Sequence, residues 1–149
     1  MRMKVLVSAC LLGENCKYSG GNNRNEKVLA WLEERGYEAV PVCPEQLGGL
    51  PTPRTPAEMV DGVVMTRDGK NVDAEFRRGA ELALARGRKD GIWMAVLQPR
   101  SPSCGAKQIY DGTFSGKLIP GDGITTELLR RNGVEVTGGS CLDRLIQTQ

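Results

Sequence analysis

The run KVLVSA at residues 4–9 is short, apolar and rich in branched side chains, which is typical of a buried β-strand. A helical pattern follows over residues 26–35, and Gly36 stands where a helix C-cap is expected. Residues 37–42, YEAVPV, predict a second strand. A strand, a helix and a strand in this order form a βαβ unit, whose strands are parallel and joined by a right-handed crossover. This unit predicts an α/β fold built on a parallel sheet.

The rest of the chain continues this alternation. A third buried strand is predicted at residues 91–97. The other expected elements are a short strand or hairpin at residues 59–66 with a turn at Asp68-Gly69, a helix at residues 74–86 between Asp73 as N-cap and Gly87, a helix at residues 125–131, a strand at residues 134–136 and a last helical turn within residues 141–149. Residues 44–56 and 99–123 are rich in glycine and proline and predict irregular loops. A length of 149 residues suits one domain, so we expect a single Rossmann-like three-layer domain over residues 1–149, with a mainly parallel sheet.

Charge and composition argue against a DNA-binding protein and against a membrane protein. The net charge is +2, whereas a dedicated duplex-binding protein usually carries a stronger basic excess. The longest apolar runs are far too short for a transmembrane helix, and the first residues lack the cleavage region of a signal peptide. We therefore expect a cytoplasmic protein that binds neither DNA nor a membrane.

Five cysteines and the absence of histidine restrict the possible chemistry. An odd number of widely spaced cysteines in a cytoplasmic chain argues against a disulfide framework. Histidine is the usual ligand of catalytic zinc and the usual general base near neutral pH. Any metal must therefore bind thiolates or carboxylates, and soft thiolates favour iron–sulfur clusters, zinc or Cu(I).

Three of the cysteines occupy equivalent places in the predicted fold. Cys10 ends the first strand, Cys43 ends the second, and Cys104 lies just beyond the third. Ligands of open parallel sheets bind outside the carboxyl ends of the strands. If the three strands are neighbours, the three thiols meet in one crevice, where we expect a shared metal site.

Two further cysteines leave the number of ligands open. Cys16 lies in the polar loop after Cys10 and could be a fourth ligand, whereas Cys141 lies near the C-terminus, away from the strand ends. Four thiolates would close the site and make it structural. Three would leave one metal position for a substrate, as catalysis requires.

Polar side chains accompany the expected ligands. Glu45 lies two residues after Cys43 and is expected to project from the same rim. Ser101 precedes Cys104 in the sequence SPSCG. Its hydroxyl could face the site, but serine is equally common as an ordinary turn residue.

Three runs of the sequence carry a family resemblance: VSACLLG at residues 7–13, PVCPEQLGGLPTPR at residues 41–54 and SPSCG at residues 101–105. Together they resemble the family once known as domain of unknown function 523, which includes the thiouracil desulfurases. The resemblance extends over about residues 4–136. It implies an oxygen-sensitive [4Fe-4S] cluster held by Cys10, Cys43 and Cys104 alone. It also implies that Glu45 and Ser101 are catalytic.

The implied reaction converts a thiolated pyrimidine, such as 2-thiouracil, 4-thiouracil or a related nucleoside, to the oxo base with release of sulfide. The substrate sulfur would bind the open iron, which polarises the C=S bond. Glu45 would take a proton from the attacking water, and Ser101 would orient the ring. Two alternatives stay open: a sulfurtransferase that carries sulfide to a nucleotide or tRNA, and a non-catalytic module in which Cys16 completes a four-thiolate zinc site.

Overall fold

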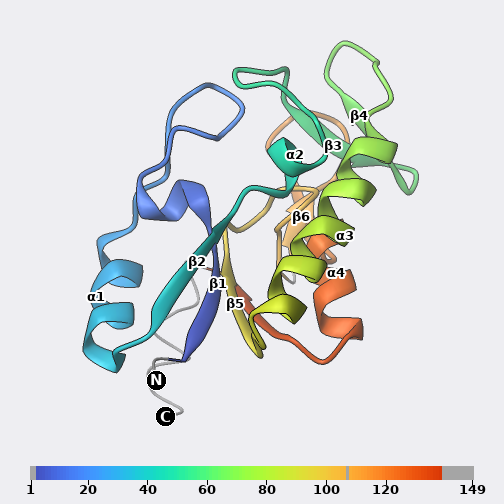
Figure 1. The fold of residues 1–149 in the computed structure, drawn as a ribbon. Coiled ribbons are helices and arrows are strands. Elements are labelled where there is room, and N and C mark those ends of the chain that lie inside the picture. Colours follow the sequence, from blue (N-terminus) through green and yellow to red (C-terminus); the bar gives the residue numbers. More distant parts are fainter. Residues whose placement is uncertain (1–2, 107, 139–149) are drawn as a thin grey trace.

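The computed structural model describes residues 3–106 and 108–138. Its central sheet has four strands, β1 (Lys4–Ser8), β2 (Glu38–Val42), β5 (Met94–Leu97) and β8 (Glu135–Gly138). Their order is β2-β1-β5-β8, and every neighbouring pair is parallel (Figure 1). Because β1 lies between β2 and β5, the three strands that precede the cysteines are neighbours, as the sequence predicts.

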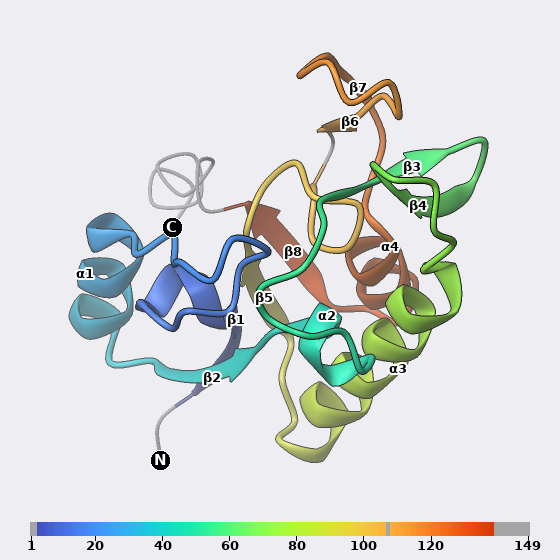
Figure 2. The same cartoon turned by 90° about the horizontal axis from the view of Figure 1, so that it is seen from above.

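Helices cover both faces of this sheet. The helix α1 (Glu26–Arg35) lies on one face, and α3 (Asp73–Lys89) and α4 (Ile124–Arg131) lie on the other (Figure 2). Alternate residues of β1 point to opposite faces: Val5 and Val7 pack with Trp31 of α1, whereas Leu6 belongs to the core that contains Leu129 of α4. The expected α/β fold with a parallel sheet between helices is confirmed. No helix in the described part of the chain is both long and apolar enough to cross a membrane.

Several elements differ from the sequence prediction. The hairpin of β3 (Ala57–Val60) and β4 (Val63–Thr66) turns at Asp61-Gly62, not at Asp68-Gly69, because both intervening residues adopt the positive φ that a tight turn needs. The loop predicted at residues 99–123 contains a second hairpin, β6 (Gln108–Tyr110) and β7 (Leu118–Pro120). A short helix, α2 (Pro44–Leu47), begins the loop predicted at residues 44–56. The expected last helical turn and Cys141 lie outside the described residues.

The helix α3 also begins and ends differently. Asp73 is its first residue, not its N-cap, and the carboxylate accepts a hydrogen bond from the backbone N–H of Val64 at 3.0 Å. This bond ties β4 to the helix. The helix continues through Gly87 to Lys89, because Gly87 keeps helical geometry inside the buried face.

A close contact between two helices fixes the position of α2. A Cβ atom added to Gly79 of α3 would lie 1.8 Å from the carbonyl oxygen of Pro44. One added to Gly48 would lie 1.9 Å from the carbonyl oxygen of Glu75. Only glycine at both positions permits this approach. The contact holds α2, and with it Cys43 and Glu45, against the longer helix α3.

Candidate active site

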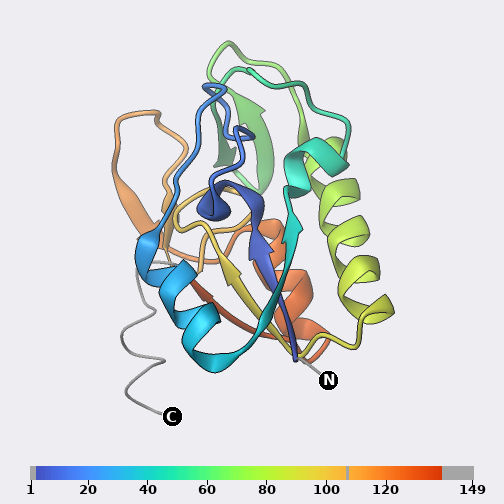
Figure 3. The same cartoon turned by 60° about the vertical axis from the view of Figure 1, so that its left-hand side comes forward.

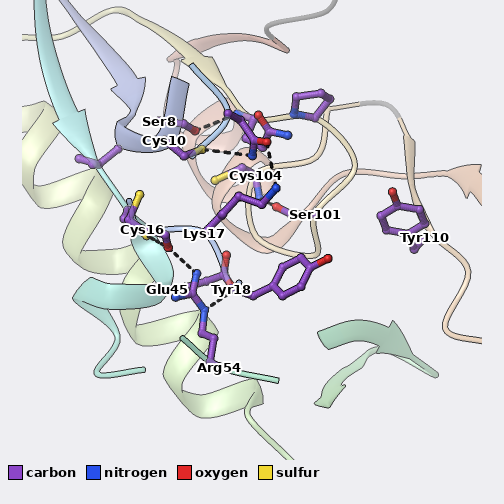
Figure 4. Close-up of a pocket in the computed structure, with 15 residues that line it drawn as sticks. Ser8, Cys10, Cys16, Lys17, Tyr18, Glu45, Arg54, Ser101, Cys104 and Tyr110 are labelled. Atoms are coloured by element: carbon purple, nitrogen blue, oxygen red, sulfur yellow. Dashed lines mark hydrogen bonds and ion pairs between the residues drawn. The ribbon is translucent and has the colours of Figure 1, made fainter. Parts of the chain in front are cut away.

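The structure brings the three strand-end cysteines together. Cys10 lies in the short 3-10 helix η1 (Ala9–Leu12) after β1, Cys43 caps α2 after β2, and Cys104 lies in the turn after β5. All three line one cavity of about 300 Å³ (Figure 4). Glu45 and Ser101 line the same cavity. The cavity lies at the carboxyl ends of the parallel strands, below the loops and hairpins seen at the top of Figure 3.

Cys16 also lies in this cavity, although its place in the sequence is away from the strand ends. Its side chain is 4% exposed. Its thiol is within hydrogen-bonding contact of those of Cys10 and Cys43, and its carbonyl oxygen accepts a hydrogen bond from Cys43 Sγ at 3.7 Å. The loop after β1 therefore folds back so that Cys16 contacts both of these cysteines.

The pKa values of the four thiols are shifted in different directions. The hydrogen bond from Cys16 lowers the pKa of Cys10, and it lowers the pKa of Cys43 to about 7. The same contacts raise the pKa of Cys16, because its single S–H proton is shared with the sulfur atoms of Cys10 and Cys43. Metal ligands must be thiolates, and the lowered pKa values of Cys10 and Cys43 lie in the direction that favours this form.

Cys104 is the exception among the expected ligands. Burial raises the pKa of its thiol to about 12. This thiol is therefore neutral in the metal-free protein, and a bound metal would have to displace its proton. The Cys104 backbone is held firmly: its N–H donates to Ser101 Oγ at 2.7 Å, and its carbonyl accepts from Thr126 Oγ1 at 2.9 Å.

Ser101 has a structural contact as well as a place in the cavity. Its Oγ accepts the hydrogen bond from Cys104 N–H, so it is a turn residue of the kind that serine commonly forms. The hydroxyl proton is not used in that bond, and a hydroxyl has one donor to offer. Ser101 can therefore hold the Cys104 turn and still donate to a molecule in the cavity.

Glu45 is aligned by an arginine that the sequence reasoning did not single out. Arg54 Nε donates to Glu45 Oε1 at 3.3 Å, and the side chains of the pair are 6% and 22% exposed, respectively. Arg54 Nη2 donates to the carbonyl of Cys16 at 2.9 Å, and Nη1 donates to Thr52 Oγ1 at 2.9 Å. One guanidinium thus joins the Cys16 loop, α2 and the proline-rich turn. The contact with Cys16 joins residues 38 positions apart, so no local pattern in the sequence signals it.

The donors around the cavity fit an iron–sulfur cluster. Thiols from separate strand ends surround a space large enough for a polyatomic group, since about 300 Å³ is roughly ten times the share of one water molecule in the liquid. Within residues 3–106 and 108–138, no three Cys, Asp or Glu side chains lie close enough to hold a single metal ion. Asn23 Nδ2 also donates to Cys10 Sγ at 3.8 Å, a hydrogen bond of the kind that tunes cluster thiolates.

Comparison with known proteins agrees with this geometry. The model of the 2-thiouracil desulfurase family matches residues 5–139. The chain belongs to this family. Two relatives match nearly the whole of this chain and nearly the whole of their own length.

One relative is YbbK of Bacillus subtilis (strain 168), an uncharacterized protein that is 38% identical and covers 95% of this chain and 99% of its own length. The other is a solved structure, the [4Fe-4S]-dependent thiouracil desulfidase TudS. It is 45% identical, with a TM-score of 0.90, over 99% of this chain and 97% of that chain. The similarity therefore extends to the whole family fold, including the strand ends that carry the cysteines.

Proposed function

We propose that this chain is a [4Fe-4S]-dependent desulfurase that converts thiolated pyrimidines to the oxo base with release of sulfide. The observation that carries the proposal is the placement of Cys10, Cys43 and Cys104 around one cavity that also contains Glu45. Family membership and 45% identity to a [4Fe-4S]-dependent thiouracil desulfidase support it. The whole chain would act as one cluster-binding catalytic domain.

The three cysteines would hold the cluster, which when bound supplies an iron with an open position that polarises a C=S bond. Cys16 would stay a thiol whose single proton is shared with the sulfur atoms of Cys10 and Cys43. Its contribution would be to stabilise two of the thiolates, not to close the site.

Glu45 would be the general base. Arg54 holds one oxygen of its carboxylate, Oε1, which leaves Oε2 to take the proton from an attacking water. Ser101 would donate its hydroxyl proton to a polar edge of the pyrimidine and so fix the orientation of the ring. Tyr18 and Tyr110 also line the cavity and offer aromatic faces to a planar heterocycle.

The substrate would be a small thiolated pyrimidine base or its nucleoside. The near-neutral net charge of +2 favours a small substrate over a polyanion such as DNA. Free thiols at Cys10, Cys16, Cys43 and Cys104 favour a reducing compartment, and we place the protein in the cytoplasm.

Anaerobic preparation of the protein, followed by metal analysis and a substrate screen, tests this function. We expect a brown protein that contains iron and acid-labile sulfide, and that releases sulfide and uracil from 2-thiouracil or 4-thiouracil. Exposure to air should bleach the absorption and abolish the reaction together. A colourless protein with stoichiometric zinc would instead support the four-thiolate module and contradict the proposal.

A further inference from the structure

Lys17 places a positive charge in the cavity. Its backbone is fixed by a tight turn, in which Lys17 N–H donates to the Gly21 carbonyl at 3.2 Å and Gly20 N–H donates to the Lys17 carbonyl at 2.9 Å. The side chain lines the cavity and runs across it in Figure 4, from the side of Cys16 toward Ser101 and Cys104. Lys17 is half-buried, and its ammonium is therefore an element of the site.

Asn23 aligns this ammonium beside an expected cluster ligand. Lys17 Nζ donates to Asn23 Oδ1 at 3.3 Å, and Nδ2 of the same amide donates to Cys10 Sγ at 3.8 Å. The backbone N–H of Asn23 donates to the Cys10 carbonyl at 3.0 Å, so the amide cannot move far from the cysteine. The amide oxygen of Asn23 accepts from Lys17, and its nitrogen donates to the sulfur of Cys10. The Asn23 side chain therefore links Lys17 to Cys10.

Lys17 also retains hydrogen-bonding capacity. Within the described ranges its Nζ donates one hydrogen bond, to Asn23, which leaves two of the three ammonium N–H groups available. The other cation of the cavity, Arg54, uses its guanidinium on Glu45, Cys16 and the Pro51-Thr52 turn. Lys17, and not Arg54, therefore has N–H groups available to donate to negative charge that forms in the cavity.

We propose that Lys17 is a further catalytic residue, whose ammonium stabilises the negative charge that forms on the substrate and on the departing sulfur. The inference rests on the proposed desulfuration. In that reaction the oxygen of water bonds to the ring carbon, and Glu45 takes one of its protons. The C–S bond then breaks and its electron pair leaves with sulfur, which takes the second proton of the water from oxygen and departs as hydrosulfide while the C=O bond forms. Glu45 returns its proton to solvent. Carbon keeps its oxidation state, so no oxidant or reductant is needed.

The physical basis is electrostatic preorganisation. A cation that is already in place stabilises developing negative charge without reorganisation. Tyr18 limits the mobility of the lysine stem, because the ammonium lies 5.9 Å from the centre of the Tyr18 ring. The stabilised charge exists only when the carbon has been attacked, so the interaction lowers the barrier and does not merely tighten binding.

The test compares cluster-loaded Lys17→Met, Lys17→Gln and Lys17→Arg with Lys89→Met, a matched control at an exposed position of α3. Iron, acid-labile sulfide and visible absorption are measured first, and all variants should match the wild type. The kcat/KM for sulfide release from 2-thiouracil and 4-thiouracil should fall about 10²-fold in Lys17→Met and Lys17→Gln, the scale for loss of a preorganised donor. Lys17→Arg, which keeps the charge, should stay within about tenfold of the wild type.

A second readout does not depend on turnover. Hydrosulfide is titrated into each cluster-loaded variant and followed by visible absorption, and the affinity should fall about tenfold when the positive charge is removed. Wild-type kcat/KM and hydrosulfide affinity in a loaded Lys17→Met or Lys17→Gln would overturn the proposal. Loss of the cluster from both variants would also overturn it, since Lys17 would then be structural. If the wild type releases no sulfide from either base, the proposed function fails, and the hydrosulfide titration alone decides the role of Lys17.

Discussion

Arg54 donates a hydrogen bond from Nε to Oε1 of Glu45 at 3.3 Å. The two residues lie on opposite sides of the proline-rich turn that follows α2, and the Arg54 guanidinium is nearly buried. Because the same guanidinium also binds the Cys16 carbonyl, Glu45, the proposed general base, and the loop that carries Cys16 share one anchor. One arginine side chain therefore positions both Glu45 and the Cys16 loop.

Loss of this anchor should destabilise the fold measurably. Arg54→Gln leaves a largely buried carboxylate and a carbonyl without their partner, and we expect the free energy of unfolding to fall by about 2 kcal/mol. Urea denaturation measures the change. The control is Arg131→Gln, which breaks an exposed ion pair with Glu127 and should cost about 0.5 kcal/mol or less. Equal stability of the two variants would mean that the Arg54 contacts contribute little.

Glu45→Gln should separate cluster binding from catalysis. The amide keeps the shape of the side chain but cannot accept a proton from water, so we expect a full cluster and a kcat lower by about 10²-fold. Glu14→Gln is the control, because Glu14 is an exposed carboxylate of the neighbouring loop and should leave kcat unchanged. If the two variants exchange these behaviours, Glu14 is the base.

Iron content should distinguish the roles of the four cysteines. Serine at position 10, 43 or 104 removes a ligand, and we expect each of Cys10→Ser, Cys43→Ser and Cys104→Ser to lose most of the iron. Cys16→Ala should keep it, because Cys16 prefers the protonated form that donates to its neighbours. Anaerobic iron and acid-labile sulfide analysis checks both expectations. Loss of iron from Cys16→Ala would support a closed four-thiolate site.

The packing of α2 on α3 offers a test of the framework. Gly79→Ala would force a methyl group to within 1.8 Å of the Pro44 carbonyl oxygen, and we expect a loss of about 3 kcal/mol in unfolding free energy. Gly87→Ala in the same helix meets its nearest atom, Ile92 Cβ, at 3.9 Å. Because alanine favours the helix, that control should be neutral or stabilising by about 1 kcal/mol. A stable Gly79→Ala would show that the two helices can separate without cost.

The sheet and the strand-end cysteines could be predicted because both depend on local patterns. A buried strand that ends in Cys10 or Cys43 is visible in the sequence, and the rules for parallel sheets bring neighbouring strand ends together. The second hairpin could not be predicted in the same way, because Leu118 and Ile119 of β7 are exposed and carry no burial pattern.

The sequence left the role of Cys16 open and did not single out Arg54, because the contacts of both depend on how the loops fold. Cys16 contacts Cys10 and Cys43 only because the loop after β1 folds back over the strand ends. Arg54 reaches Cys16 across 38 residues of sequence, and nothing in its immediate neighbours signals that partner. Such contacts depend on the conformation of irregular loops, which periodicity does not determine.

Oxygen transfer from water tests the central claim most directly. The cluster-loaded protein is given 2-thiouracil or 4-thiouracil under anaerobic conditions in water enriched in ¹⁸O, and sulfide and uracil are quantified together. Hydrolytic desulfuration predicts equal amounts of sulfide and uracil, with one ¹⁸O atom in each uracil at the carbon that carried sulfur. Sulfide release without uracil, or uracil whose new oxygen does not come from water, would contradict the account.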